Sequence, residues 1–301
     1  MTLAPIALFT FKKVSPLKAT IAALQRNYLA KDSELVVFSD GAKKSHDVQQ
    51  VEQVRAYLKT LTGFKKVTLQ ISETNKGLAT SIIEGVTQLL ALHETVIVLE
   101  DDLVTSPNFL NFMNAGLDYY KKNTSILSIS GYTPQLKVNK EYAFDTYFTQ
   151  RASSWGWATY REQWNKVDWR VSDYENFKVD QQAKKKFNQM GSDMSFMLSK
   201  QMSGKIDSWA IRWCYHQYRN NLFSVFPTRS KIENIGFMAG ATHTTGKNES
   251  SRFATLLDTS NKTHFDFNPN IALEKRFIKY FVKPYSLKTR VYYKLKGLFR
   301  L

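Results

Sequence analysis

The chain has 301 residues, with 42 Lys or Arg against 26 Asp or Glu, so its formal net charge is +16. Hydrophobic residues make up 43% of the chain and charged residues 23%, which excludes a disordered or low-complexity protein. The single cysteine, Cys214, excludes an intrachain disulfide and a cysteine-based zinc cluster. The length suits one large domain or two modest ones.

The chain from Met1 to Gly131 alternates between short apolar runs and segments with helical periodicity. We expect strands near residues 6–11, 34–39, 67–71, 96–99 and 126–130. We expect helices near residues 15–28, 48–61, 78–92 and 107–121. Strands that alternate with helices in this way predict an α/β fold with a mostly parallel, doubly wound sheet.

After Gly131 the pattern changes to an irregular, aromatic-rich second half. Residues 142–150 predict an antiparallel or edge strand, and residues 222–226 predict a further strand. The chain lacks an internal repeat and a linker rich in Pro, Ser or Gly. We therefore expect one domain over residues 1–270, with halves at 1–131 and 132–270, followed by a basic tail over 271–301.

The tail carries half of the net charge, because it holds nine basic residues against Glu274 alone. On a helix, Leu287, Val291, Leu295 and Leu298 would share one face. Eight excess positive charges suit an anionic membrane surface. A solvated basic helix and a protein-docking segment remain as alternatives. Nothing in the sequence approaches the about 20 apolar residues of a membrane span.

Three adjacent acids, Glu100, Asp101 and Asp102, directly follow the predicted strand at 96–99. Ligands of open α/β sheets bind outside the carboxyl ends of the strands, which is where these acids are expected. Like charges this close raise one another's pKa, and a divalent cation would relieve that cost. Mg²⁺ and Mn²⁺ favour one or two carboxylates together with phosphate oxygens, so a metal–diphosphate substrate fits. A solvated acidic turn is the alternative.

Two further signals fall at the same predicted edge. Asp40 follows a strand and could accept a hydrogen bond from a base or a ribose. Lys76 precedes a helix whose N-terminus favours an anion. Each alone is a common turn, but together with the three acids they indicate a nucleotide site.

These motifs resemble those of GT-A glycosyltransferases, in particular the group around N-acetylglucosaminyltransferase I and related bacterial sugar transferases. The resemblance rests on Ser-Asp-Gly at 39–41, Asn-Lys-Gly-Leu at 75–78 and Glu-Asp-Asp-Leu-Val-Thr-Ser-Pro-Asn-Phe at 100–109. It continues through 153–158 and 207–213 and covers roughly residues 4–245. It implies a GT-A fold with a nucleotide-sugar-binding half at 1–131 and an acceptor half at 132–270.

The resemblance also implies roles for single residues. Asp102 would be a direct ligand of Mn²⁺ or Mg²⁺, and His243 would approach the same metal. The predicted donor-binding residues are Thr10, Phe11, Asp40, Lys76, Glu100 and Asp101. Of these, Asp40 would pair with the base, while Glu100 and Asp101 would contact the sugar or the ribose.

Asp207 resembles the catalytic base of an inverting transfer, which removes the proton from the acceptor hydroxyl. Because Asp207 also precedes a helical stretch, a helix N-cap is the alternative. Trp155 and Trp157 offer flat faces that could stack on a sugar ring, and the alternative for both is a buried core position.

The implied function is a metal-dependent, inverting glycosyltransferase that favours a UDP-sugar donor and a glycan acceptor, lipid-linked, in cell-surface polysaccharide synthesis. This implies a cytoplasmic enzyme, peripheral on the inner face of the membrane. A nucleotidyltransferase is an alternative, but residues 11–15 lack the glycines of its usual phosphate loop. A nucleic-acid-binding protein is disfavoured because the charge is concentrated in the tail. A non-catalytic sugar-binding homologue remains open.

Overall fold

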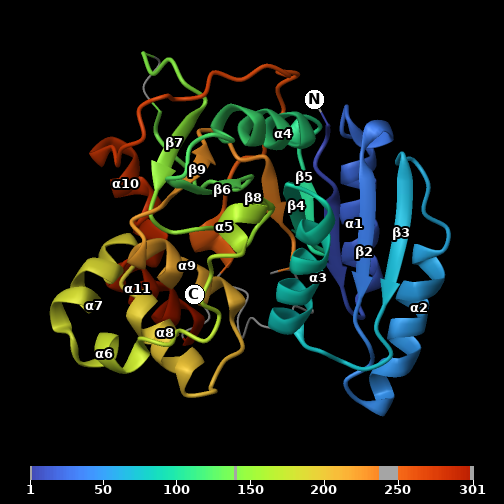
Figure 1. Cartoon of the computed structure of the whole chain (residues 1–301), viewed down its shortest axis with the longest axis horizontal. Helices are drawn as coiled ribbons and strands as arrows, with labels where there is room; N and C mark the ends of the chain where they lie inside the picture. Colours follow the sequence, from blue (N-terminus) through green and yellow to red (C-terminus); the bar gives the residue numbers. More distant parts are fainter. Residues whose placement is uncertain (1, 139–140, 237–249, 299–301) are drawn as a thin grey trace.

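The computed structural model describes residues 2–138, 141–236 and 250–298. Its central element is an eight-stranded sheet in the order β3-β2-β1-β4-β8-β6-β9-β7 (Figure 1). The strands are β1 (Ile6–Thr10), β2 (Glu34–Ser39), β3 (Lys66–Ile71), β4 (Thr95–Glu100), β6 (Ile126–Ser130), β7 (Thr146–Thr149), β8 (Trp157–Tyr160) and β9 (Phe223–Pro227). Only β7 and β8 run against their neighbours, so the predicted mostly parallel sheet is confirmed.

Helices cover both faces of the sheet. Residues of α1 (Val14–Gln25), α2 (Val48–Leu58) and α4 (Phe109–Tyr120) share one core cluster with Ile6 and Leu8 of β1. Residues of α3 (Leu78–Leu92) and α9 (Trp209–Arg219) share the other cluster with Ala7 and Phe9. Successive residues of a strand point to opposite faces, so β1 contributes to both cores. The predicted doubly wound arrangement is confirmed.

The second half contains short elements between longer loops. Besides α9, four shorter α-helices lie in this part of the described chain: α5 (Arg161–Trp164), α6 (Tyr174–Val179), α7 (Gln181–Phe187) and α8 (Met194–Met202). A separate antiparallel pair consists of β5 (Leu103–Thr105) and β10 (Ile232–Asn234). The predicted edge strand is confirmed as β7, which pairs with β9 at the end of the sheet. In Figure 1, α6 to α9 lie together on the side of the molecule away from β1 to β3.

The first part of the basic tail belongs to the folded body. The tail folds into α10 (Lys275–Phe281), a 3₁₀ turn (Lys283–Tyr285) and α11 (Leu287–Leu298). Phe277 and Phe281 are buried against Tyr147 of β7 and Phe226 of β9. The expected boundary at residue 271 is therefore too early, because Phe277 and Phe281, one helical turn apart, pack on the last two strands of the sheet. In the described residues, no helix combines the length and apolarity needed to cross a bilayer.

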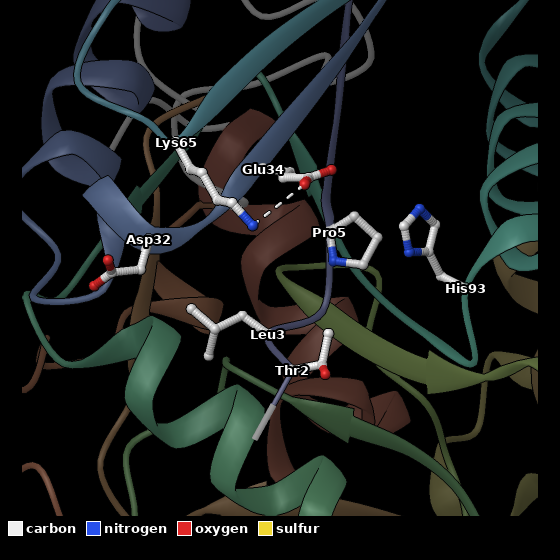
Figure 2. Close-up of a pocket in the computed structure, with 7 residues that line it drawn as sticks. All are labelled: Thr2, Leu3, Pro5, Asp32, Glu34, Lys65 and His93. Carbon is white, nitrogen blue, oxygen red and sulfur yellow. Dashed lines mark ion pairs between the residues drawn. The ribbon is translucent and has the colours of Figure 1, made fainter.

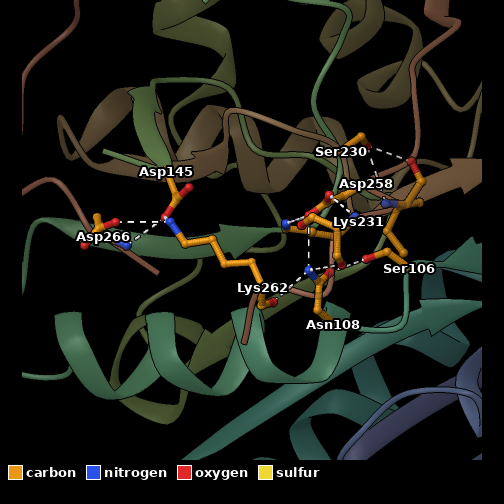
Figure 3. A network of polar contacts seen from close by, with 10 residues as sticks. Ser106, Asn108, Asp145, Ser230, Lys231, Asp258, Lys262 and Asp266 are labelled. Carbon is orange, nitrogen blue, oxygen red and sulfur yellow. Dashed lines mark hydrogen bonds and ion pairs between the residues drawn. The ribbon is translucent and has the colours of Figure 1, made fainter. Parts of the chain in front are cut away.

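A buried polar network holds the segment before α10 in place (Figure 3). The Lys231 ammonium forms an ion pair with Asp258, and both side chains are almost fully buried. The Asn108 side chain donates to Asp258 and to the carbonyl oxygens of Ser260 and Lys262. This network, which we call the Lys231–Asp258 clamp, ties residues 258–262 to the start of α4 and to the residue before β10.

Candidate functional site

The three acids lie at the point where the strand order reverses. The chain builds β1, β2 and β3 outward in one direction and then returns to place β4 on the other side of β1. In open α/β sheets, the crevice at such a switch point, outside the carboxyl ends of the strands, is where ligands bind. β1 ends at Thr10 and β4 ends at Glu100, with Phe9 and Glu100 in register. The site is therefore a consequence of topology as well as of the acidic motif.

Asp101 joins the two strands at this crevice. One of its carboxylate oxygens accepts hydrogen bonds from the Thr10 hydroxyl at 2.6 Å and from the Phe11 backbone N–H at 3.3 Å. Burial raises the pKa of Asp101, and these two hydrogen bonds oppose the rise. Three residues predicted from the motifs, Thr10, Phe11 and Asp101, are thus brought together in the structure.

Glu100 and Asp102 flank this hydrogen-bonded carboxylate. Burial, followed by the negative charge of Asp101, raises the pKa of Asp102 to about 6. Burial, with smaller contributions from Asp102 and Asp101, raises the pKa of Glu100 well above its usual range. The charge of Lys13, which precedes α1, opposes the rise in pKa at Asp101 and Asp102. The crevice therefore concentrates negative charge that a bound cation would stabilise.

The donor set fits a cation that is shared with a substrate. Among the residues that the structure describes, there is no group of three or more His, Cys, Asp or Glu side chains arranged to hold a metal. Mg²⁺ and Mn²⁺ commonly take one or two carboxylates and complete their shell with water and phosphate oxygens. Asp102, with no side chain in the described residues hydrogen-bonded to its carboxylate, fits that role. The other predicted metal residue, His243, lies outside the described residues.

A loop after β10 covers Asp102 closely. The Ile235 backbone N–H donates to the Asp102 carbonyl oxygen at 2.9 Å. A Cβ atom at Gly236 would lie 1.9 Å from Asp102 Oδ2, so a larger residue there would displace the Asp102 carboxylate. Neither Gly236 nor Lys13 was predicted as part of the site. The Asn-x-Gly turn at 234–236 was the available signal, but its contact joins positions far apart in the chain.

Asp40 holds a loop instead of facing an open pocket. Its carboxylate accepts four hydrogen bonds at 2.9–3.0 Å, from the backbone N–H groups of Gly41, Lys76 and Gly77 and from the Asn75 side chain. A Cβ atom at Gly41 would lie 2.4 Å from the backbone of Thr74. Asp40 and Gly41 thus fix residues 73–77, the loop between β3 and α3, through hydrogen bonds and close backbone contact.

The C-terminal end of this loop lies next to the side chain of Asp207. Gly77, with φ of 78°, is the N-cap of α3, and a Cβ atom there would lie 3.6 Å from Asp207 Oδ2. The Asp207 side chain is 61% exposed, and its Oδ1 lies 3.9 Å from an Arg212 nitrogen. The alternative reading of Asp207 as the cap of α9 is wrong, because Ser208 is the N-cap and accepts from the Ile211 N–H.

The remaining predicted side chains have different environments. Lys76 extends to an exposed ion pair with Glu84, with 2.7 Å between Nζ and Oε2. Trp157 is 1% exposed and packs against Trp164, Trp209 and Trp213. Its predicted stacking on a sugar is therefore wrong in this structure, and the core alternative holds.

Trp155 is only partly buried. It packs edge-on against Tyr132, with 4.6 Å between ring centroids, and against Phe253, at 5.6 Å. Of the two predicted stacking residues, it is the one with accessible surface.

A hollow also lies at the opposite edge of the sheet (Figure 2). It is lined by residues at the amino ends of the parallel strands: Thr2, Leu3, Pro5, Asp32, Glu34, Lys65 and His93. Lys65 pairs with Glu34 across it, with 3.6 Å between Nζ and Oε1. The amino ends of strands are not where ligands of open α/β sheets bind, so we place the candidate site at the acids.

No family model and no curated protein matches the chain. Among the solved structures that resemble it is the mannosyltransferase PcManGT from Pyrobaculum calidifontis in complex with GDP-Man and Mn²⁺, which matches 55% of the chain at 14% identity and a TM-score of 0.38. Another is TarS from S. aureus, which matches 55% of the chain at 16% identity and a TM-score of 0.34. The matched part spans 47% of the first protein and 30% of the second. At TM-scores this low, neither structure carries an argument about what this chain does.

Proposed function

We propose that the chain is a metal-dependent, inverting glycosyltransferase of the GT-A type. It would move a sugar from a nucleotide-diphosphate donor to a hydroxyl group of a glycan. The observation that carries the proposal is the set of partly buried carboxylates at the switch point between β1 and β4, with an exposed Asp207 at the same edge of the sheet.

The donor would lie across the crevice at 100–102. Asp102 would hold Mn²⁺ or Mg²⁺, while Glu100 and the free oxygen of Asp101 would face the sugar or the ribose. When bound, the cation offsets negative charge that develops on the departing diphosphate. Thr10 and Phe11 would line the base pocket, since Asp101 already fixes them beside the acids.

Asp207 would act as the general base. Its carboxylate would take the proton from the acceptor hydroxyl as that oxygen attacks the anomeric carbon and the bond to the diphosphate breaks. A single displacement inverts the anomeric configuration and needs one base. Support comes from the exposure of Asp207 and from its carboxylate, which lies beside Gly77 at the start of α3. Because Ser208 caps α9, Asp207 is not needed for that role.

We propose a revised role for Asp40 and a conditional one for Lys76. Asp40 would serve donor binding by fixing the loop at 73–77, and its four hydrogen bonds support this over a direct contact with the base. Lys76 could reach a diphosphate by leaving Glu84. Exposed ion pairs contribute about 0–1 kcal/mol, so this exchange costs little.

The donor and acceptor are proposed only as classes. We favour a UDP-sugar carrying a hexosyl or N-acetylhexosaminyl group, and Trp155 as the ring that stacks on the acceptor. A lipid-linked glycan of cell-surface polysaccharide synthesis would place the enzyme in the cytoplasm, peripheral on the inner face of the membrane. These choices rest on the motif resemblance together with the basic C-terminal region.

A thermal-shift panel tests the class. UDP-, GDP-, CMP- and dTDP-sugars are each added with Mn²⁺, with Mg²⁺ and with EDTA. A donor at 100 times its Kd should stabilise the fold by about 2.7 kcal/mol, and only with metal present. Stabilisation by a nucleoside triphosphate alone would instead favour a nucleotidyltransferase, and no response to any nucleotide would reject both.

Asp102→Asn tests the metal assignment. It should remove the metal-dependent part of the donor shift and lower turnover at least about 100-fold, because cation binding at the diphosphate is lost. The matched control is Asp118→Asn, an exposed acid on α4 that pairs with Lys121. Metal-dependent binding at the wild-type level in Asp102→Asn would remove Asp102 from the site.

A further inference from the structure

Helix α11 presents an apolar face that the rest of the described chain leaves uncovered. Leu287, Val291 and Leu295 recur every four residues, and their side chains are 63%, 46% and 48% exposed. Residues four apart lie on one face of a helix. Tyr292, at 59% exposed, extends the same face toward one side. Four large apolar side chains in solvent on a single helix call for a partner surface.

Lysines flank this face on both sides. At 100° per residue, Lys288 and Lys294 fall on opposite borders of the strip formed by Leu287, Val291 and Leu295, and both are exposed. The other side of the helix is turned to the body of the protein. There Arg290 donates to the Ser192 hydroxyl at 3.4 Å, and Tyr293 is partly buried. The exposed side of α11 is therefore both apolar and positively charged.

The helix is attached to the body through a buried base. Phe277 and Phe281 of α10 fill the edge of the sheet. The Arg151 guanidinium stacks on Tyr285, just before α11, with 3.7 Å between Arg151 Cζ and the centroid of the tyrosine ring. Arg151 is held in turn by two hydrogen bonds to Asp193, at 2.8 and 3.0 Å. This chain of contacts ends just before α11 and supports its position on the body.

We propose that the α11 face, formed by Leu287, Val291 and Leu295 with Lys288 and Lys294 at its borders, binds the surface of an anionic lipid bilayer. An amphipathic helix lies in the interface with its apolar side among the acyl chains and its lysines at the headgroups. Each lysine near an anionic surface strengthens binding about fivefold. The inference deepens the peripheral location within the proposed function, because it assigns that location to one helix face.

A second copy of the chain is a less favourable occupant. A two-fold contact brings the same patch together with itself, so the lysines of one α11 would approach those of the other. A bilayer with anionic headgroups neutralises both borders at once. Nucleic acid would neutralise the lysines but would leave the apolar centre of the face without a partner.

Vesicle sedimentation tests the proposal, with the full chain and no nucleotide sugar. Large vesicles of phosphatidylcholine with about 30% phosphatidylglycerol are compared with pure phosphatidylcholine, at low and at moderate salt. The chain should sediment with the anionic vesicles and not with the neutral ones. Failure to bind anionic vesicles at low salt would overturn the proposal.

Two double variants separate the apolar and the charged contributions. Val291→Asp with Leu295→Asp should weaken partitioning at least about tenfold. Lys288→Glu with Lys294→Glu should do the same by reversing the charge of both borders. The control is Lys185→Glu with Lys186→Glu on α7, which makes an equal charge change at exposed sites outside α11. An equal drop in vesicle partitioning in the α7 control would contradict an assignment to α11. Unchanged partitioning in both α11 variants would contradict it as well.

Two additional readouts distinguish other causes. Light scattering should give a monomer for the wild-type chain, and a dimer that the α11 variants dissociate would assign the face to a second copy instead. The metal-dependent donor shift should be unchanged in all variants. A failure of vesicle binding with an intact donor shift rejects this inference alone, and the reverse result rejects only the proposed activity.

Discussion

The three carboxylates after β4 have separate surroundings although they are adjacent in the chain. Asp101 is hydrogen-bonded across to β1, whereas Asp102 lies against the backbone of Gly236. Asp40, two strands away, also has a structural role, because its oxygens accept hydrogen bonds from the loop before α3. At the scale of residues, Asp40 and Asp101 hold the backbone around the candidate site, whereas Asp102 is the carboxylate that we propose binds the cation.

Asp40→Asn should destabilise the protein even without nucleotide. An asparagine side chain turns one acceptor oxygen into an N–H donor that would face donors of the 75–77 loop. A fully buried donor left unpaired costs about 1–3 kcal/mol, so at this partly buried position we expect a loss near the lower end of that range. Urea unfolding of the nucleotide-free protein measures the change, with Asp32→Asn, an exposed acid, as control. Equal stability of the two variants, with donor binding lost only in the first, would return Asp40 to a direct contact with the base.

The sequence predicted which residues gather at the carboxyl edge, because strand ends in a parallel sheet share one edge. It could not predict how each side chain is used. Three of the four donors on Asp40 come from the loop after β3, and the burial of Trp157 depends on α9, which follows much later in the chain. Contacts of this range are set by tertiary packing, so the local motif Trp-Gly-Trp fits a core position and a binding position equally well.

At the scale of elements, long periodic segments were predictable, and short ones were predictable only where aromatic and β-branched residues cluster, as at β7. The helices at 78–92 and 107–121 show apolar residues at helical spacing, and the structure has α3 and α4 there. By contrast, β5, β8 and β10 are too short for a period to show. Their pairing depends on partners distant in the sequence, as β10 with β5 illustrates.

The Lys231–Asp258 clamp makes a prediction at this scale. Removing one partner, as in Lys231→Met, leaves an uncompensated buried carboxylate and should cost about 3–5 kcal/mol. Replacing both, with Lys231→Met and Asp258→Leu, should recover most of that loss. Chemical unfolding of the three proteins measures the difference. Equal stability of the single variant and the wild type would show that the clamp does not stabilise the fold.

The Lys231–Asp258 clamp should also make the free energy of unfolding depend on pH in the acid range. Burial raises the pKa of Asp258, but the hydrogen bond from Lys231 and other donors outweighs it and lowers that pKa from 3.8 to about 2. A carboxyl whose pKa is lower in the folded state binds fewer protons there than in the unfolded state. Its contribution is therefore complete above about pH 4 and is lost as the pH falls toward 2. Unfolding free energies at several pH values should show this loss in the wild type and not in the double variant.

At the scale of the whole molecule, the C-terminal basic segment divides into a structural part and an exposed part. The net charge of +16 first suggests a nucleic-acid-binding protein, but half of it lies after residue 270. Within that region, α10 completes the core beside β7 and β9, while α11 keeps its apolar and basic side in solvent. The position of the charge was predictable from the sequence, and the division between the two helices was not.

Two truncations test this division. A chain that ends at Ser286 loses α11 and should keep its thermal midpoint within a few degrees. A chain that ends at Leu273 also loses Phe277 and Phe281, and removing one buried phenylalanine alone costs about 3–5 kcal/mol. It should unfold at a much lower temperature or fail to fold. Similar midpoints for the two truncated chains would contradict a structural role for α10.

The place of β8 in the sheet bears on the order in which the protein can be assembled. β8 lies between β4 and β6 and pairs with both, although it is synthesised after β6 and β7. Until Trp157–Tyr160 have left the ribosome, one side of β4 has no strand to pair with. β6 cannot yet be joined to β4, because β8 is the strand that lies between them. Open strand edges of this kind associate with other chains. The half of the chain that carries the acids therefore depends on the second half to close its sheet, and expressing it alone would expose the edge that β8 covers.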